Sequence, residues 1–337
     1  MRNIVNYIKI KHKDIAKTLD DVLVDRRFKI EKDATYAYIP VKEAPKGYVI
    51  IEKDIPLQKN FKSEVMKILS LNEQKEVVTA YDTIGSIAIL EIPEILQKKE
   101  HQIASLLLEC KKSIKTVVKK ASIHQGEFRI QNYTYLAGEE TFETTHKENN
   151  TFITLNINTV YYSPRSASER KRILQQVTSK ENILVMFSGC APFVCVIGKN
   201  AKPKSIVGIE LNKEGHMYGL RNIQKNKLSC ASLINGDVIL ECSRLTASFD
   251  RIIMPLPKSA ELFLDAAFSV AKKGTIIHLY SFSHEKDFPK KTISLIDAAC
   301  KRHGITYTVL STVLCGNYSP RVHRVCVDFK VLDIPRD

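Results

Sequence analysis

Strand and helix signals alternate along the second half of the chain, and this alternation restricts its fold more than any other feature. Short apolar runs typical of strands are each followed by a longer segment typical of a helix. A doubly wound sheet with mostly parallel strands has this pattern. The predicted strands cover residues 181–187, 205–211, 231–238, 249–256 and 274–282, and the predicted helices begin at 192 and cover 214–228, 259–274 and 288–304.

Two further predictions concern the end of this region. The helix over 259–274 is expected to end at Gly274, because glycine commonly caps a helix C-terminus. Residues 305–314 and 323–332 are two more strands, joined by CGNYSPRV. This connection is too short for a crossover helix, so we expect an antiparallel hairpin at one end of the sheet.

The preceding residues have a different organisation. Residues 1–56 contain three strand signals and one short helix, and residues 60–160 mix helices and strands with many lysines. The sequence therefore predicts three parts. A Rossmann-like α/β domain over 161–337 follows two smaller α+β domains over 1–56 and 60–160.

The charge of the chain favours a polyanionic partner. Lys and Arg number 51 against 37 Asp and Glu, a formal net charge of +14. RNA or DNA is the first expectation and an acidic membrane surface the second, while a solvated lysine-rich surface is the plainer alternative.

The sequence contains no run of 18 apolar residues, so we expect no membrane span. The N-terminus also lacks the apolar core of a secretory signal. None of the eight cysteines forms a C-x-x-C pair, so we expect reduced thiols in a cytoplasmic protein without a metal site.

The ends of the predicted strands carry the candidate cofactor residues. Glu210, at the end of the second strand, is placed to accept hydrogen bonds from ribose hydroxyls, as in enzymes that use NAD or S-adenosylmethionine. The first turn, SGCAPF, has one glycine and a proline, and it is a poor cradle for pyrophosphate. Asp237, at the end of the third strand, suits an adenine amino group. The pattern favours S-adenosylmethionine over NAD, and solvated loop acids are the plainer alternative.

A more specific pattern begins at residue 126. The motifs are GEFR, LAGE, HKEN, YYSPR-x-x-x-ER, the strand before FSG, FDRIIM-x-LPKSA and NYSPR-x-x-x-VCVDFKV. In these the chain resembles the archaeal and eukaryotic tRNA (guanine-N1)-methyltransferases, which act on guanosine 37 beside the anticodon. The resemblance is strong over about residues 120–337, whereas the first 120 residues match in layout alone.

The resemblance implies a class I methyltransferase domain, S-adenosyl-L-methionine as cofactor and tRNA as partner. It also implies an N-terminal domain that touches the tRNA elbow and an active site at the anticodon loop, and we expect a monomer. The implied catalytic residues are Glu169, as general base, and Arg129, which stabilises negative charge on guanine O6. The implied cofactor-binding residues are Tyr161, Arg170, Met186, Phe187, Gly189, Glu210, Asp237 and Pro255.

Acid–base chemistry agrees with these roles. Guanine N1 carries a proton at neutral pH, so methylation there requires a base, and a guanidinium at O6 helps as charge develops. Two positions depart from the family: Val185 stands where many members have Asp, and Pro255 where many have Asn. Aminocarboxypropyl transfer in wyosine synthesis and a non-catalytic tRNA-binding relative are the alternatives. The intact Glu169 motif favours methylation.

Overall fold

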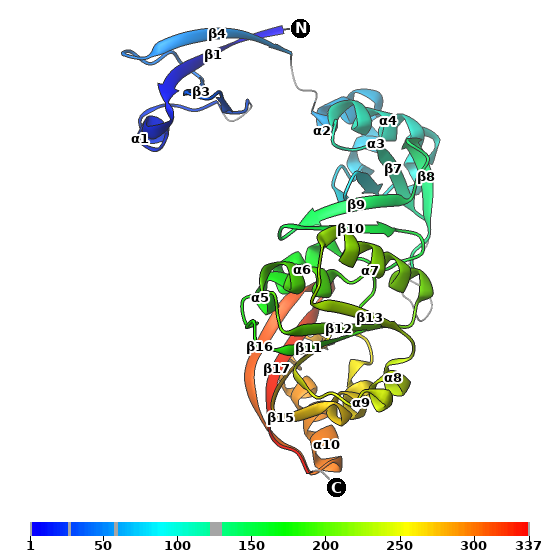
Figure 1. Ribbon diagram of the computed structural model, residues 1–337. Coiled ribbons are helices and arrows are strands. Elements are labelled where there is room, and N and C mark those ends of the chain that lie inside the picture. Colours follow the sequence, from blue (N-terminus) through cyan, green and yellow to red (C-terminus); the bar gives the residue numbers. More distant parts are fainter. Residues whose placement is uncertain (1, 26–27, 57–59, 122–129, 336–337) are drawn as a thin grey trace. The chain divides into compact units, whose positions relative to one another are not determined.

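The computed structural model describes residues 2–25, 28–56, 60–121 and 130–335, and the chain divides into two compact units, Met1–Ile68 and Leu69–Asp337. In the first unit an antiparallel sheet has the order β2-β3-β1-β4, and α1 lies against one face of it (Figure 1). That face carries a small core of Ile8, Ile39 and Val41. The elements are β1 (Arg2–Lys11), α1 (Ile15–Asp21), β2 (Glu31–Lys32), β3 (Tyr36–Val41), β4 (Val49–Pro56) and α2 (Phe61–Ile68).

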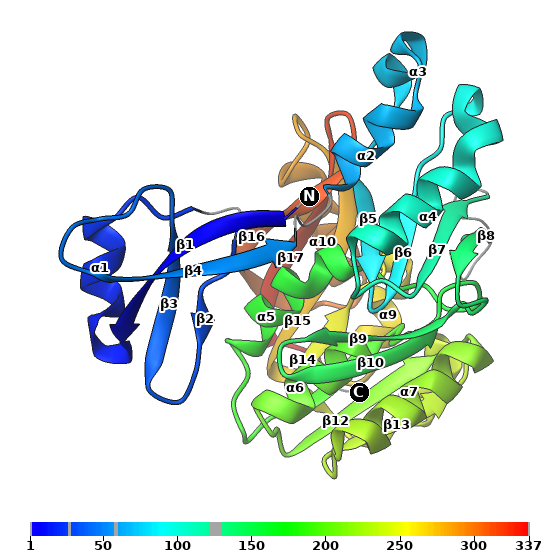
Figure 2. The same cartoon turned by 90° about the horizontal axis from the view of Figure 1, so that it is seen from above.

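The second unit begins with a four-stranded sheet of order β5-β6-β7-β8, packed against α4. A two-stranded ribbon of β9 and β10 follows, and it runs across α6 and α7 of the next layer (Figure 2). The elements up to this point are α3 (Leu71–Glu76), β5 (Tyr81–Ile84), β6 (Ile87–Leu90), α4 (Glu100–Cys110), β7 (Thr116–Lys120), β8 (Tyr133–Gly138), β9 (Glu143–Glu148) and β10 (Thr151–Asn156).

A seven-stranded sheet of order β13-β12-β11-β14-β15-β17-β16 forms the rest of this unit. Strands β11 to β15 pair in parallel, whereas β17 is antiparallel to both of its neighbours, which confirms the predicted doubly wound sheet and terminal hairpin. The elements are α5 (Ala167–Leu174), β11 (Asn182–Met186), α6 (Pro192–Asn200), β12 (Ser205–Glu210), α7 (Lys213–Asn226), β13 (Ala231–Asn235), α8 (Val238–Arg244), β14 (Phe249–Met254), α9 (Leu264–Ser269), β15 (Ala271–His284), α10 (Lys290–Arg302), β16 (Thr306–Ser319) and β17 (Val322–Asp333).

Helices cover both faces of the large sheet. Helices α5, α6 and α7 lie on one face and α8, α9 and α10 on the other (Figure 1). Alternate residues of β11 serve the two cores, since Ile183 and Val185 pack toward α6 and Leu184 and Met186 toward α8 and α9. No helix in the described part of the chain is long and apolar enough to cross a membrane.

The prediction of a helix over 259–274 is wrong after Ser269. A 3₁₀ turn over Ala260–Phe263 leads into α9, which ends at Ser269, and the chain joins β15 from Ala271. The hydroxyl of Thr275 accepts a hydrogen bond from the backbone N–H of Lys272 and donates one to the carbonyl of Phe249. These bonds hold residues 272–275 as a bulge in the ladder with β14, so Gly274 lies inside a strand. Helix α8 was missed because a strand was extended through Val238.

Two glycines with nearly the same φ allow a test of close packing. Gly138 has φ +96°, and a methyl group on it would lie 2.0 Å from the carbonyl oxygen of Lys115. Gly274 has φ +94° with nothing within 4 Å of the same position. We predict that Gly138→Ala lowers the free energy of unfolding by at least about 2 kcal/mol more than Gly274→Ala. Chemical denaturation of both variants measures the difference, and equal losses would contradict the packing.

Candidate functional site

A cavity of about 400 Å³ opens at the carboxyl ends of β11, β12, β13 and β14. We call it the larger cavity. Parallel α/β sheets bind their ligands at this edge. Six of the predicted cofactor residues line the larger cavity: Tyr161, Phe187, Gly189, Glu210, Asp237 and Pro255. The fold therefore brings together residues that lie as far as 94 positions apart, from 161 to 255, in the sequence.

The turn after β11 forms one wall of the larger cavity by adopting an unusual backbone. Phe187 has φ +57° and Ala191 has φ +64°, values that side-chain-bearing residues rarely adopt. Pro192 then occupies the first turn of α6, where its missing N–H leaves no bond unmade. Such strained positions cluster where a backbone must approach a ligand. The ring of Phe187 packs edge-on against Phe263, with ring centroids 4.8 Å apart.

Glu210 is the carboxylate of the larger cavity. Its oxygens accept hydrogen bonds from the backbone N–H groups of Gly189, at 2.5 Å, and Asn212, at 2.8 Å. Burial raises the pKa of Glu210, and these N–H groups oppose that rise. The carboxylate is thus fixed at the end of β12, and its remaining lone pairs are available to hydroxyl groups of a ligand.

Asp237 and a group of apolar side chains complete the larger cavity. Asp237 caps α8, because its Oδ1 accepts from the backbone N–H groups of Ile239 and Leu240 at 2.8 and 3.2 Å. Sequence reasoning missed the apolar lining, which a ring system needs for stacking and exclusion of water. These side chains are Leu211, Val238, Leu256, Leu262 and Phe263. Leu211 directly follows β12, whereas Leu262 and Phe263 belong to a 3₁₀ turn after β14, so no single sequence signal marks the whole group.

The two other predicted cofactor residues lie elsewhere. Met186 is fully buried in the core beside Leu184 and Ile209. Arg170 lines a second, smaller cavity of about 80 Å³ that shares Tyr161 and Pro255 with the larger cavity. Their predicted contacts with the cofactor stay predictions.

The smaller cavity contains the predicted base. Glu169, in the first turn of α5, is 5% exposed, and its Oε2 accepts hydrogen bonds from Arg172 Nε at 2.9 Å and the Tyr280 hydroxyl at 3.1 Å. Both donors fix the orientation of the carboxylate. The GEFR segment with Arg129 lies outside the described residues, so the role of Arg129 also stays a prediction.

Two polar atoms of the smaller cavity have no hydrogen-bond partner within the described residues. They are the hydroxyl of Ser188 and Nε of Arg324. The Nη atoms of Arg324 donate to the Ser166 hydroxyl and the carbonyl of Cys315, at 2.7 and 3.0 Å. Buried polar groups are normally satisfied, so these two solvent-shielded atoms are exceptions among the residues that line the smaller cavity.

Arg170 is held by a residue that sequence reasoning did not single out. Glu148, at the end of β9, accepts from Arg170 Nε at 2.5 Å and Nη2 at 2.7 Å, and it also accepts from the Tyr162 hydroxyl at 2.9 Å. The side chains of this pair are 3% and 4% exposed. Burial by itself lowers the pKa of Arg170, but the hydrogen bonds and charge of Glu148 raise it, so the guanidinium stays charged. Glu148 lies within HKEN, and that motif was the available signal.

The fold and the larger cavity are those of a class I methyltransferase, with the cofactor cavity at the strand ends. Comparison with known proteins agrees. A family model described as the TRM5/TYW2 methyltransferase domain matches residues 144–310, and one described as the TYW2 N-terminal domain matches residues 62–141.

Curated relatives extend the match to most of the chain. The tRNA (guanine(37)-N(1))-methyltransferase Trm5b of Pyrococcus abyssi is 32% identical, over 91% of this chain and 92% of its own. Its crystal structure covers 97% of this chain and 99% of its own, with a TM-score of 0.74. A structure of aTrm5 with tRNALeu is 28% identical and covers 98% of this chain and 100% of its own, with a TM-score of 0.72. A tRNA(Phe) (4-demethylwyosine(37)-C(7)) aminocarboxypropyltransferase of Pyrococcus horikoshii is 28% identical, over 80% of this chain and 97% of its own.

The chain belongs to the TRM5/TYW2 methyltransferase family. The family resemblance predicted from the motifs is confirmed, as are the fold class and S-adenosylmethionine as the family's cofactor.

The buried pair of Glu148 and Arg170 gives a prediction for stability. Glu148→Gln leaves an uncompensated buried guanidinium, so we expect the free energy of unfolding to fall by about 3 kcal/mol or more. The double variant Glu148→Gln/Arg170→Met removes both charges and should lose less. The exposed Glu140→Gln is the matched control. Denaturant titrations measure all three, and a loss for Glu148→Gln no larger than that of the control would contradict the pairing.

Proposed function

We propose that this protein transfers the methyl group of S-adenosylmethionine to N1 of guanosine 37 in tRNA. The observation that carries the proposal is the division of the site into two joined cavities. The larger cavity has the carboxylate, the apolar lining and the volume for the cofactor. The smaller cavity has Glu169 and meets the larger one at Tyr161 and Pro255.

The residues of the larger cavity fit S-adenosylmethionine. We infer that Glu210 accepts hydrogen bonds from the ribose hydroxyls, since Gly189 and Asn212 hold its carboxylate in place. Asp237 Oδ1 is occupied by the N-terminus of α8, which leaves Oδ2 for the adenine amino group. The rings and aliphatic chains around them pack against the base. When bound, the cofactor supplies a methyl group on a positively charged sulfur.

The chain's own chemistry lies in the smaller cavity. Guanine N1 must lose its proton as the new bond to carbon forms, and we infer that Glu169 accepts that proton. Arg172 and Tyr280 orient the Glu169 carboxylate. We infer that Ser188 and Arg324, which line this cavity, lie against the inserted nucleotide. Arg129 keeps its proposed role at O6, and Arg170 and Met186 keep theirs near the cofactor.

Pro255 lies at the boundary between the proposed guanine pocket and the cofactor cavity, where it affects the shape of the pocket. It lines both cavities and offers a carbonyl but neither an N–H nor a polar side chain. Val185, the other departure from the family, is buried in the core on the α6 side of the sheet. Its side chain is therefore a packing residue, and backbone groups near Gly189 take the place of a carboxylate.

We infer that the first unit contacts tRNA at the elbow. On the sheet face away from its core, the Lys9 ammonium lies 4.0 Å from the centre of the Tyr36 ring and the Lys53 ammonium 4.5 Å from that of Tyr38. Lysines interleaved with aromatic rings suit phosphates and bases or sugars, and the net charge of +14 agrees. The monomeric state is part of the same proposal.

The test of the proposal is a transfer assay with defined products. Purified protein and labelled S-adenosylmethionine are given tRNA transcripts with guanosine or adenosine at position 37, and the nucleosides are identified by mass. We predict 1-methylguanosine from the guanosine transcript alone. Glu169→Gln should lower the transfer rate at least about 100-fold, because the general base is lost, with cofactor affinity within about twofold.

The outcomes separate the competing functions. A labelled aminocarboxypropyl group on a wyosine precursor, with none on guanosine, would favour the activity of the Pyrococcus horikoshii relative instead. Binding of tRNA without turnover would indicate a non-catalytic relative. Unchanged transfer by Glu169→Gln would remove Glu169 from the role of base.

Cofactor binding provides a separate prediction. Glu210→Gln should weaken the binding of S-adenosylhomocysteine at least about 30-fold, since the amide lacks the charge that strengthens bonds to ribose hydroxyls. Glu214→Gln, at an exposed position in the first turn of α7, is the matched control. Isothermal titration calorimetry measures both, and equal affinities would exclude Glu210 as the ribose ligand.

A further inference from the structure

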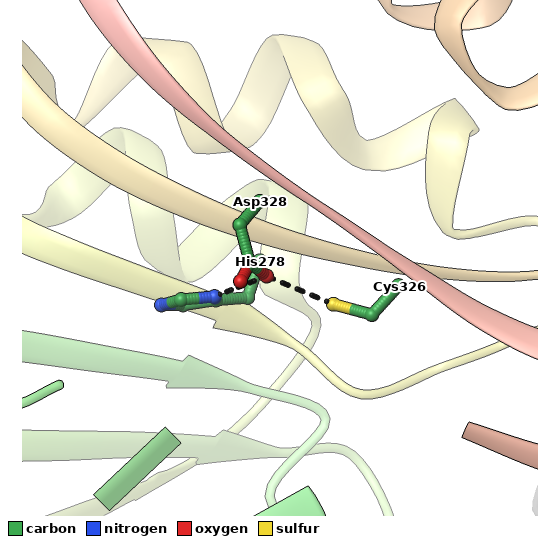
Figure 3. A group of neighbouring side chains, drawn as sticks. All are labelled: His278, Cys326 and Asp328. Atoms are coloured by element: carbon green, nitrogen blue, oxygen red, sulfur yellow. Dashed lines mark hydrogen bonds and ion pairs between the residues drawn. The ribbon is translucent and has the colours of Figure 1, made fainter. Parts of the chain in front are cut away.

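A group of buried polar side chains lies on the α5 side of the large sheet, outside both cavities. Figure 3 shows His278 and Cys326 directed at the carboxylate of Asp328. Their potential ligand atoms all lie within 4.8 Å of one another, which is close enough to suggest a metal site.

The surroundings of this group argue for a different role. Nε2 of His278 accepts a hydrogen bond from Arg251 at 2.7 Å, and Asp328 accepts from Arg172 at 2.5 Å, so two guanidinium groups already occupy the positions of a cation. Burial raises the pKa of Cys326 well above its ordinary value, so the thiol stays protonated and donates to Asp328. The three side chains therefore belong to a hydrogen-bond network.

The sheet register sets the core of this network. Asp328 on β17 lies opposite His278 on β15 and Ser311 on β16. His278 Nδ1 and the Ser311 hydroxyl each donate to the Asp328 carboxylate at 2.7 Å. Burial alone raises the pKa of Asp328, but the bonds from His278, Arg172 and Ser311 lower it well below its ordinary range. Asp328 is thus a fixed anion in the middle of three strands.

The network ends at the predicted base. Arg172 lies one turn after Glu169 on α5, and its guanidinium bridges two carboxylates, with Nη1 at 2.5 Å from Asp328 and Nε at 2.9 Å from Glu169. At the other end, Arg251 Nε lies 2.7 Å from Glu181. The order of charges is therefore negative at Glu181, positive at Arg251, neutral at His278, negative at Asp328, positive at Arg172 and negative at Glu169.

Two sequence motifs supply this network. Arg251 belongs to FDRIIM and Asp328 to VCVDFKV, segments that carry the family resemblance. Neither side chain lines either cavity. Both side chains are connected to Glu169 through hydrogen bonds, and this connection explains why the motifs contain these residues.

We propose that Asp328 is a positioning residue for Glu169, acting through Arg172. This inference rests on the proposed methyl transfer. Asp328 holds the Arg172 guanidinium in place and offsets part of its positive charge. Arg172 can then orient the Glu169 carboxylate without cancelling the negative charge of that carboxylate. The chain from His278 to Glu181 holds Asp328 in turn.

Loss of the Asp328 charge has a defined consequence. The charge of Arg172 would then bear on Glu169 alone, and Glu169 would accept a proton less readily. The other titratable or charged groups around Glu169 keep their charge states in that variant, since Cys326, which donates to Asp328, is a neutral thiol, so the effect is assigned to Arg172. These groups are Arg170 on α5, Tyr161 and Tyr162 before it, Tyr280 on β15, Cys315 on β16 and Arg324 and Cys326 on β17.

The experiment compares Asp328→Asn with the unaltered protein in single-turnover transfer to tRNA with guanosine 37, from pH 5 to 9. We expect the plateau rate to fall about tenfold or more and the acidic limb of the pH–rate profile to move to lower pH. Affinities for S-adenosylhomocysteine and tRNA should stay within about twofold. Asp333→Asn, an exposed carboxylate on the same strand, is the matched control and should match the unaltered protein.

A second variant covers the case in which Asp328→Asn folds poorly. Arg172→Gln/Asp328→Asn removes both charges of the pair, which costs less stability than removing one. If Asp328 acts through Arg172, the double variant transfers at the rate of Arg172→Gln alone. Thermal melting reports the folded fraction of each variant.

The outcomes are distinct. A lower melting temperature with an unchanged plateau rate and pH profile would make Asp328 purely structural and overturn the inference. A double variant slower than Arg172→Gln by the full Asp328→Asn factor would also overturn it. Absence of transfer by the unaltered protein would instead reject the proposed function, and the inference with it.

Discussion

The buried ion pair of Glu148 and Arg170 is the interaction on which the site depends. Glu148 ends β9 and Arg170 lies in α5, so the pair fastens the ribbon that precedes the large sheet to the helix that carries Glu169. Arg170 also donates to the carbonyl of Ser163, just before α5. Because Glu169 is the neighbour of Arg170, the same contacts fix the position of the proposed base in the smaller cavity.

A second pair of contacts connects the ribbon with the cofactor side. The Asn222 side chain of α7 donates to the carbonyls of Thr154 on β10 and Cys190 in the turn after β11, both at 2.9 Å. Asn212, which caps α7, donates to the Thr159 carbonyl and to Glu210. Residues 143–160 are therefore linked to the strained turn through Asn222, and to the carboxylate of the larger cavity through Asn212. These bonds fix the positions of the two cavities relative to each other, as a transfer between two bound molecules requires.

The sequence allowed much of the fold to be predicted, since the alternation of strand and helix signals is a local property. Glu210 and Asp237 could be proposed because strand ends meet at one edge of a parallel sheet. The helix over 259–274 was predicted too long because nothing local indicates that Thr275 bonds to Phe249 and forms a bulge. Glu148, Arg172 and Asp328 were missed for a similar reason. Their roles come from pairing with residues 22 to 156 positions away in the chain.

We propose that the cofactor and the target guanine occupy two cavities that meet at Tyr161 and Pro255, and that Glu169 contacts the guanine. A crystal structure of the protein with S-adenosylhomocysteine and tRNA bearing guanosine 37 tests it most directly. We predict that the sulfur of the ligand lies in the larger cavity and faces that boundary, and that guanine N1 lies within about 2.6–3.2 Å of a Glu169 oxygen. A guanine outside the smaller cavity, with N1 facing another residue, would contradict it.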